Sequence, residues 1–229
     1  MTDTRAELVE SFFIGTGHSY ETVVRYGTFG IDAYWKRKIF AKVPPAQAIL
    51  DLACGTGIVS FGLLKRNPNA RLVGLDVTAD YLQVARAKAQ RLGANIEFIH
   101  ANAENVSLSG RFDCITSSYI PKYVDANKLL KNISPALRSG GKMVLHDFAY
   151  PRNAFTRTIW HGYNRALNFA GKRVFPEWQV VFDNNLTALI MRTNWVNEFA
   201  TALPQHGYVD IEVEHLTFGS AAIISARKL

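Results

Sequence analysis

A glycine-rich turn carries the clearest chemical signal in the sequence. The segment Asp51-Leu-Ala-Cys-Gly55-Thr-Gly57 follows an expected strand and leads into an expected helix over residues 59–66. Glycines at such a turn let the backbone bend sharply and let a ligand approach it closely. We therefore expect Gly55, Thr56 and Gly57 to contact a bound nucleotide or a related ligand.

The acidic residue before the turn narrows the choice of ligand. Asp51 lies four residues before Gly55, where a carboxylate suits the ammonium group of a methionine moiety and would repel a pyrophosphate. A dinucleotide-binding fingerprint counted from Gly55 would place glycine or alanine where the chain has Ser60. Both features favour S-adenosylmethionine over NAD as the cofactor. A nicotinamide oxidoreductase is the remote alternative.

Three further segments each follow an expected strand. Asp76 ends the second strand, where an acidic side chain can accept hydrogen bonds from ribose hydroxyls, and Val77 comes directly after it. Asn102 and Ala103 follow the third strand, where an amide can both donate to and accept from the adenine edge. Ser118 follows the fourth strand. Because ligands of doubly wound folds bind at the carboxyl ends of the strands, we expect these residues to converge on one crevice.

A parallel sheet must bring these strand ends together. Residues 48–149 alternate short runs rich in β-branched residues with helical patterns, which is typical of βαβ units. The expected strands cover residues 49–53, 71–76, 96–100, 112–116 and 142–146. Between them we expect one helix that Thr78 caps and Gly93 stops, and a second whose apolar residues run from Leu130 to Leu137.

The C-terminal residues predict two antiparallel strands. Residues 208–216 alternate polar and apolar types, residues 220–226 are apolar, and only three residues separate the two runs. So short a connection cannot hold a crossover helix. The whole pattern predicts an α/β fold with a doubly wound, Rossmann-like, seven-stranded and mostly parallel sheet that ends in an antiparallel hairpin, as in class I methyltransferases.

The chain length of 229 residues predicts a single domain with additions. We expect residues 46–149 to form the cofactor-binding core and residues 206–229 to supply the terminal strands. The other two segments, residues 1–45 and 150–205, are rich in aromatic residues. We expect them to form a helical cover over the cofactor.

Composition excludes several other classes of protein. A hydrophobic fraction of 48% with 20% charged residues is ordinary for a folded domain. The N-terminal residues lack the apolar stretch of a signal peptide, and no apolar run reaches the roughly 18 residues that span a bilayer, so we expect a cytoplasmic protein. Cys54 and Cys114 are expected to be buried thiols, without a disulfide or a metal site.

The formal net charge of +7 raises the question of a nucleic-acid substrate. The basic residues are scattered rather than clustered, so we expect no stable nucleic-acid partner. A methyltransferase that acts on base amino groups would carry an Asn/Asp-Pro-Pro-aromatic segment where the chain reads Ser118-Tyr-Ile-Pro121, and Cys114 lies too early to be the nucleophile of a cytosine-carbon enzyme. Methylation of RNA, or of another small molecule, is the alternative that stays open.

With these segments in place, the chain resembles the UbiE-type carbon methyltransferases of ubiquinone and menaquinone biosynthesis from about residue 20 to residue 228. The resemblance rests on the glycine-rich turn, on residues 102–104, 117–119 and 137–145, and on Thr28-Phe-Gly-Ile-Asp-Ala-Tyr-Trp-Lys36. It implies cofactor contacts at Thr56, Asp76, Asn102, Ala103 and Ser118. The chain departs from the family's pattern at Lys122-Tyr123, where members carry Arg-Asn, and at Asp147, where they carry glutamate.

The resemblance also implies transfer of the sulfonium methyl group to a ring carbon of a prenylated quinol. The residues expected to bind that acceptor are Tyr20, Trp35, Tyr119, Lys122 and Trp160. A base beside the quinol hydroxyl would favour the phenolate and raise electron density at the adjacent carbon, and Asp147 and His161 are the candidates for it. Such an acceptor dissolves in membranes, so we also expect a weak peripheral contact of the basic surface with anionic lipid.

Overall fold

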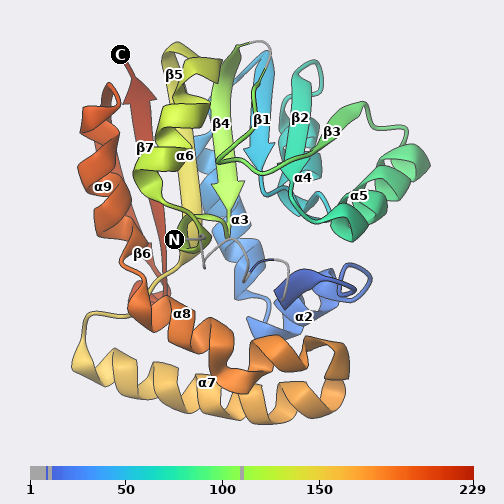
Figure 1. Ribbon diagram of the computed structural model, residues 1–229, viewed down its shortest axis with the longest axis vertical. Helices are drawn as coiled ribbons and strands as arrows, with labels where there is room; N and C mark the ends of the chain where they lie inside the picture. Colours follow the sequence, from blue (N-terminus) through green and yellow to red (C-terminus); the bar gives the residue numbers. More distant parts are fainter. Residues whose placement is uncertain (1–8, 10–11, 109–110) are drawn as a thin grey trace.

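A seven-stranded sheet forms the centre of the molecule in the computed structural model, which describes residues 9, 12–108 and 111–229 (Figure 1). Its strand order is β3-β2-β1-β4-β5-β7-β6. The strands are β1 (Ala48–Leu52), β2 (Arg71–Asp76), β3 (Ile96–His100), β4 (Phe112–Ser118), β5 (Leu137–Phe148), β6 (Tyr208–Leu216) and β7 (Ala221–Lys228). The first five run parallel, whereas β7 lies antiparallel between β5 and β6. The predicted doubly wound sheet with its antiparallel C-terminal pair is confirmed.

Helices cover both faces of the sheet and one of its edges. They are α2 (Tyr20–Gly27), α3 (Ile31–Lys42), α4 (Ile58–Arg66), α5 (Ala79–Leu92), α6 (Ala126–Ile133), α7 (Ala154–Val174), α8 (Leu186–Arg192) and α9 (Trp195–Gln205). Leu130 of α6 and Phe199 of α9 belong to the apolar cluster on one face of the sheet. Ile39 of α3 and Leu63 of α4 belong to the cluster on the other face. Because the sheet is covered on both faces, every residue of β1 is buried.

The cover lies across the carboxyl edge of the parallel strands, where α2, α7 and α8 meet (Figure 1). Val23 of α2, Leu167 of α7 and Leu189 of α8 pack in one apolar cluster there. The neighbouring helix α9 behaves differently, since it contacts α6, β6 and β7. Its buried residues recur every three to four positions along one side, which suits packing on a sheet. The segment 150–205 therefore supplies a sheet-packing helix as well as a cover.

Two local predictions differ from the structure. The second predicted helix ends at Ile133, and Leu137 opens β5, because Pro135 lies in a single 3₁₀ turn between them and a proline cannot continue an α-helix. Thr78 stands at the N-terminus of α5, but its side chain makes no capping bond. Its backbone N–H instead donates to Asp76.

The prediction that the two cysteines are buried thiols is confirmed, because Cys54 and Cys114 are free and buried. Among the described residues, no group of histidine, cysteine and acidic side chains is placed to hold a metal ion. Nor does this part of the chain contain a helix both long enough and apolar enough to cross a bilayer.

Candidate functional site

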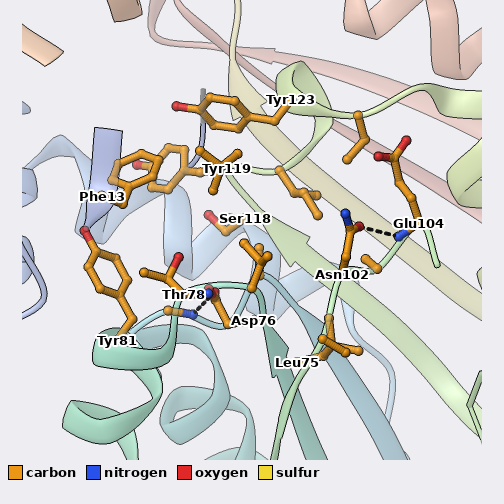
Figure 2. Close-up of a pocket in the computed structure, with 18 of the residues that line it drawn as sticks. Phe13, Leu75, Asp76, Thr78, Tyr81, Asn102, Glu104, Ser118, Tyr119 and Tyr123 are labelled. Atoms are coloured by element: carbon orange, nitrogen blue, oxygen red, sulfur yellow. Dashed lines mark hydrogen bonds between the residues drawn. The ribbon is translucent and has the colours of Figure 1, made fainter. Parts of the chain in front are cut away.

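A cavity of about 750 Å³ lies at the carboxyl edge of the sheet, where doubly wound folds bind ligands (Figure 2). Residues that end or follow β1, β2, β3 and β4 form its floor: Ala53, Gly55, Leu75, Asp76, Val77, Thr78, Ala101, Asn102, Ala103, Glu104, Ser118, Tyr119 and Ile120. Mostly aromatic residues close it on the other side: Val9, Phe13, Tyr20, Tyr81, Tyr123 and Val124. We call this space the cofactor cavity.

The glycine-rich turn is tied to the end of β2. Gly55 N donates to Asp76 Oδ2 at 2.7 Å. Gly55 and Gly57 have φ angles of 55° and 85°, which residues with a side chain adopt only at a cost. A Cβ atom on Gly57 would also lie 2.6 Å from the ring of Phe61. The turn therefore brings backbone to the cavity at Gly55, while Gly57 has no room for a side chain.

Asp76 is held rigidly at the cavity floor. Its Oδ2 accepts the bond from Gly55, and its Oδ1 accepts one from Thr78 N at 2.8 Å. Burial raises the pKa of this carboxyl, while the two backbone donors act in the opposite direction. Each carboxylate oxygen has a second lone pair. Asp76 can therefore still accept hydrogen bonds from a pair of ligand hydroxyls.

Asn102 lies on the same floor with a fixed orientation. Its Oδ1 accepts a hydrogen bond from Glu104 N at 2.8 Å (Figure 2). The amide plane is thereby set, and its NH₂ group is the end that can donate to a ligand. Val77 and Ala103 also line the cavity. The arrangement is suited to a flat, nitrogen-rich ring.

Asp51 and Thr56 lie below the cavity surface rather than on it. Asp51 is buried and accepts hydrogen bonds from Ser60 Oγ at 2.6 Å and from Thr116 Oγ1 at 3.0 Å. Burial raises the pKa of Asp51 to about 6. Thr56 Oγ1 donates to Glu21 Oε1 of α2 at 2.8 Å. These residues, with Gly57, brace the turn, and they do not line the cofactor cavity.

A second, more apolar cavity of about 1060 Å³ lies between the cover and the ends of β5 and β7. The lining residues are Gly27, Thr28, Phe29, Ile31, Trp35, Phe148, Pro151, Thr156, Ile159, Trp160, Tyr163, Asn164, Leu167, Leu186, Ile190, Thr217, Phe218 and Ser220. Trp35 is oriented by a hydrogen bond from its Nε1 to Thr217 Oγ1 at 2.8 Å. A space of this composition suits a large apolar ligand.

Two stacked rings form a wall between the cavities. Tyr119 lines the cofactor cavity, Phe148 lines the apolar cavity, and their ring centroids lie 4.8 Å apart with an interplanar angle of 20°. Tyr119 has a φ of 78°, a left-handed conformation that is strained for a tyrosine. Lys122 Nζ donates to its carbonyl oxygen at 3.0 Å and so helps to hold it.

A buried polar network supports this wall. The Tyr119 hydroxyl donates to Asp32 Oδ1. Lys36 Nζ donates to Asp32 Oδ1 at 2.9 Å and to Ser118 Oγ at 2.8 Å, and it lies 4.2 Å from the centroid of the Tyr119 ring. Burial lowers the pKa of Lys36, and the nearby Asp32 carboxylate acts in the opposite direction. Burial also raises the pKa of Tyr119. A cation and a phenol proton are thus held between the two cavities.

A sequence model of the ubiE/COQ5 methyltransferase family matches residues 1–228 of the chain. The chain belongs to this family. It is therefore an S-adenosylmethionine-dependent methyltransferase. Its relatives include a demethylmenaquinone methyltransferase from Thermus thermophilus, 30% identical over 89% of this chain and 94% of the relative. Another is a ubiquinone/menaquinone biosynthesis C-methyltransferase from Dinoroseobacter shibae, 28% identical over 99% of this chain and 93% of the relative.

Solved structures share the fold of this methyltransferase. A geranyl diphosphate C-methyltransferase from Streptomyces coelicolor, solved with S-adenosylhomocysteine, has a TM-score of 0.61 and 15% identity over 86% of this chain and 78% of its own. A phosphoethanolamine N-methyltransferase from Haemonchus contortus, solved with S-adenosylmethionine, has a TM-score of 0.61 and 16% identity over 89% of this chain. This chain spans only 58% of the length of that enzyme.

The structure does not bring the two predicted bases of this methyltransferase to either cavity. Asp147 is fully buried and forms an ion pair with Lys122, with Asp147 Oδ1 2.7 Å from Lys122 Nζ. Lys122, which was predicted to bind substrate, is therefore paired with Asp147 and lines neither cavity. His161 is exposed on α7, where its Nε2 shares a hydrogen bond of 2.9 Å with the hydroxyl of Tyr150.

The other predicted contacts divide between the two cavities. Gly55, Asp76, Val77, Asn102, Ala103 and Ser118 line the cofactor cavity, together with the predicted substrate residues Tyr20 and Tyr119. Trp35 and Trp160 line the apolar cavity. Asp32 and Lys36 were not among the predicted site residues, although their spacing of four residues on one helix is a recognised signal of an ion pair.

Proposed function

We propose that this methyltransferase adds a methyl group to a ring carbon of a prenylated quinol in menaquinone or ubiquinone biosynthesis. The main structural support is the apolar cavity of about 1060 Å³, which adjoins the cofactor cavity across the stacked rings of Tyr119 and Phe148. The names of the relatives from Thermus thermophilus and Dinoroseobacter shibae support the same class of acceptor.

The residues of the cofactor cavity fit S-adenosylmethionine. Asp76 would offer its remaining lone pairs to the ribose hydroxyls, and the Asn102 amide would donate to the adenine, with Val77 and Ala103 as apolar contacts for the ring. Gly55 and Ser118, which line the same cavity, would contact the methionine part. When bound, the cofactor supplies an electrophilic methyl group, so the protein's task is to align the acceptor and exclude water.

The apolar cavity accommodates the prenyl tail of the acceptor. Trp35, Trp160 and Ile190 are buried side chains of its lining, and Leu167 adds apolar surface from α7. With the tail in this cavity, the quinol ring reaches the wall formed by Tyr119 and Phe148. Flat aromatic rings can stack there at a low cost in conformational entropy.

The polar network behind the wall activates the quinol in this proposal, in place of Asp147 and His161. The positive charge of Lys36 favours the phenolate form of the acceptor. The quinol proton passes to the Tyr119 oxygen as the proton of Tyr119 passes to Asp32. The phenolate raises electron density at the adjacent carbon, which would bond to the methyl group as the carbon–sulfur bond of the cofactor breaks. The hydrogen on that carbon would then be lost as a proton to solvent, while the proton on Asp32 returns through Tyr119 to the quinol oxygen.

The test of the acceptor class is an assay of the purified enzyme with radiolabelled S-adenosylmethionine. The acceptors are demethylmenaquinol, a demethylated ubiquinol precursor and tRNA. We expect label in a quinol and none in tRNA. Labelling of tRNA alone, or of neither quinol, would overturn the proposal.

The test of the network uses single substitutions at its proton-carrying groups. Tyr119→Phe and Asp32→Asn should each lower kcat by about 10²- to 10⁴-fold, the usual contribution of acid–base catalysis, and leave the cofactor Kd unchanged. Tyr34→Phe is the matched control, because Tyr34 is exposed and lies on α3, the helix that carries Asp32. Full activity in both network variants would show that alignment alone supplies the rate.

A further inference from the structure

Helix α7 presents large apolar side chains to the solvent. Phe155, Ile159 and Phe169 are 73%, 57% and 65% exposed. Their spacing places them on one side of the helix, opposite the buried Trp160 and Gly171. Figure 1 shows α7 as the outermost element of the cover, with α8 between it and the sheet. A row of exposed apolar side chains of this kind marks an interaction surface.

The same helix is strongly basic. Over its 21 residues it carries four arginines and lysines and no aspartate or glutamate. Lys172 pairs with Asp183. By its spacing Arg173 lies in line with Phe155 and Arg165 lies beside the row, whereas Arg157 lies on the opposite side. Arg173 binds a backbone carbonyl oxygen at 2.9 Å, which does not neutralise its charge. Cations beside an exposed apolar row are the pattern of helices that lie in the interface of an anionic bilayer.

The apolar row continues into the mouth of the apolar cavity. Ile159 belongs to both, since it is exposed on α7 and lines that cavity. Phe29 and Phe218 also line the cavity, and they are 80% and 86% exposed. The mouth of the cavity is therefore rimmed with exposed apolar side chains next to the outward face of α7.

We propose that the outward face of α7 docks on the surface of an anionic bilayer, with the mouth of the apolar cavity turned toward the lipid. A lipophilic acceptor then enters the cavity without crossing water, a consequence that rests on the proposed function. A second copy of the chain is a poorer occupant, because pairing two such faces would bring basic helices together. Anionic lipid headgroups complement the same charges.

The experiment is flotation with phosphatidylcholine vesicles that contain or lack phosphatidylglycerol. The parent enzyme should float with the anionic vesicles at low salt and less at high salt. The variant Phe155→Ser/Phe169→Ser should bind about tenfold more weakly, because two large apolar side chains leave the interface. The control Leu92→Ser/Val213→Ser removes two exposed apolar side chains elsewhere and should bind like the parent.

A charge variant tests the second half of the pattern. Arg165→Gln/Arg173→Gln should lose binding to anionic vesicles, whereas Arg91→Gln/Lys131→Gln, two exposed cations on other helices, should keep it. All variants should keep the cofactor Kd and the activity toward a tail-less quinol in solution. The α7 variants should be slow only with a long-tailed acceptor in vesicles.

Two results would overturn the docking proposal. One is flotation of the α7 variants equal to that of the parent. The other is a parent that binds no vesicles and sediments as a dimer that Phe155→Ser/Phe169→Ser dissociates, which would assign the face to a second copy. Vesicle binding needs no acceptor, so an enzyme that binds vesicles and methylates no quinol would sink the proposed function and leave the docking face intact.

Discussion

Replacing Asp147 by asparagine would leave the ammonium group of Lys122 buried without a counter-charge. In the folded enzyme Lys122 Nζ lies 2.7 Å from Asp147 Oδ1, and the two side chains are 2% and 0% exposed. Removing one partner of such a pair costs about 3–5 kcal/mol. The loss has an upper limit, because Lys122 can release its proton and so remove the buried charge. Neutralising a lysine of ordinary pKa at pH 7 costs about 5 kcal/mol. We therefore expect Asp147→Asn to lower the free energy of unfolding by about 3–5 kcal/mol at pH 7.

The pH dependence of this loss distinguishes a charge effect from a packing defect. Burial lowers the pKa of Lys122 already in the parent, where Asp147 counteracts it. In the variant the pKa of Lys122 falls further, so the unfolded chain binds more protons than the folded chain. The stability of the variant relative to the parent should then rise by up to about 1.4 kcal/mol per pH unit, between the lowered pKa and about pH 10.4.

Urea unfolding followed by tryptophan fluorescence at several pH values measures both quantities. Asp210→Asn is the control, because that carboxylate is 66% exposed in its pair with Arg227 and should be worth at most about 1 kcal/mol. The double variant Lys122→Met/Asp147→Asn should recover most of the stability, since no buried charge is left. A loss below about 1 kcal/mol in Asp147→Asn, or one that does not change with pH, would refute the reasoning.

Three further predictions concern the cofactor cavity and the glycine-rich turn beside it. Asp76→Ala should weaken the binding of S-adenosylhomocysteine by about 1.5–3 kcal/mol in calorimetric titration, because a charged acceptor is lost; an unchanged Kd would remove Asp76 from the site. Burial raises the pKa of Asp51 to about 6, above its unfolded value of about 3.9, so the folded parent should lose up to about 3 kcal/mol as pH rises from about 4 to 6. Asp51→Asn should lack this slope in urea unfolding, and a slope of equal size would contradict the assignment. Tyr123 has a buried hydroxyl with no hydrogen-bond partner among the described residues, and its side chain lines the cofactor cavity. Tyr123→Phe should not lower stability, and it should raise the cofactor Kd or the acceptor KM by about 2- to 12-fold; no change in either would leave this hydroxyl without a ligand.

The floor of the cofactor cavity was predictable because it depends on the sheet alone. Asp76, Asn102 and Ser118 each end or follow a parallel strand, and the carboxyl ends of such strands share one edge. The alternation and apolar runs of the sequence set the strands, so the residues after them had to converge. The same reasoning predicted the antiparallel β6 and β7, since the three residues expected between them are too few for a crossover.

The contacts that support the glycine-rich turn, and the wall of Tyr119 and Phe148, depend on segments far apart in the sequence. Sequence patterns do not record such contacts. Thr56 turns away from the cavity toward Glu21, which lies 35 residues earlier in the chain. Tyr119 and Asp32 meet only because α3 packs against the sheet face behind β4 and β5. Asp147 looked like a base at a strand end, and its ion pair with Lys122 follows from the 3₁₀ turn that places residue 122 beside β5.

The two cavities meet at a wall, yet no described residue lines both of them. Every described residue of the cofactor cavity lies at or before Val124, and most of the apolar cavity comes from Phe148 and later residues. Under the proposed function, most of the acceptor recognition is thus encoded by a later stretch of the gene than the donor recognition. Evolution can therefore alter the later stretch to accept a new molecule while the donor-binding half stays intact. A designer could do the same by exchanging residues 149–190 between relatives and keeping the wall of Tyr119 and Phe148.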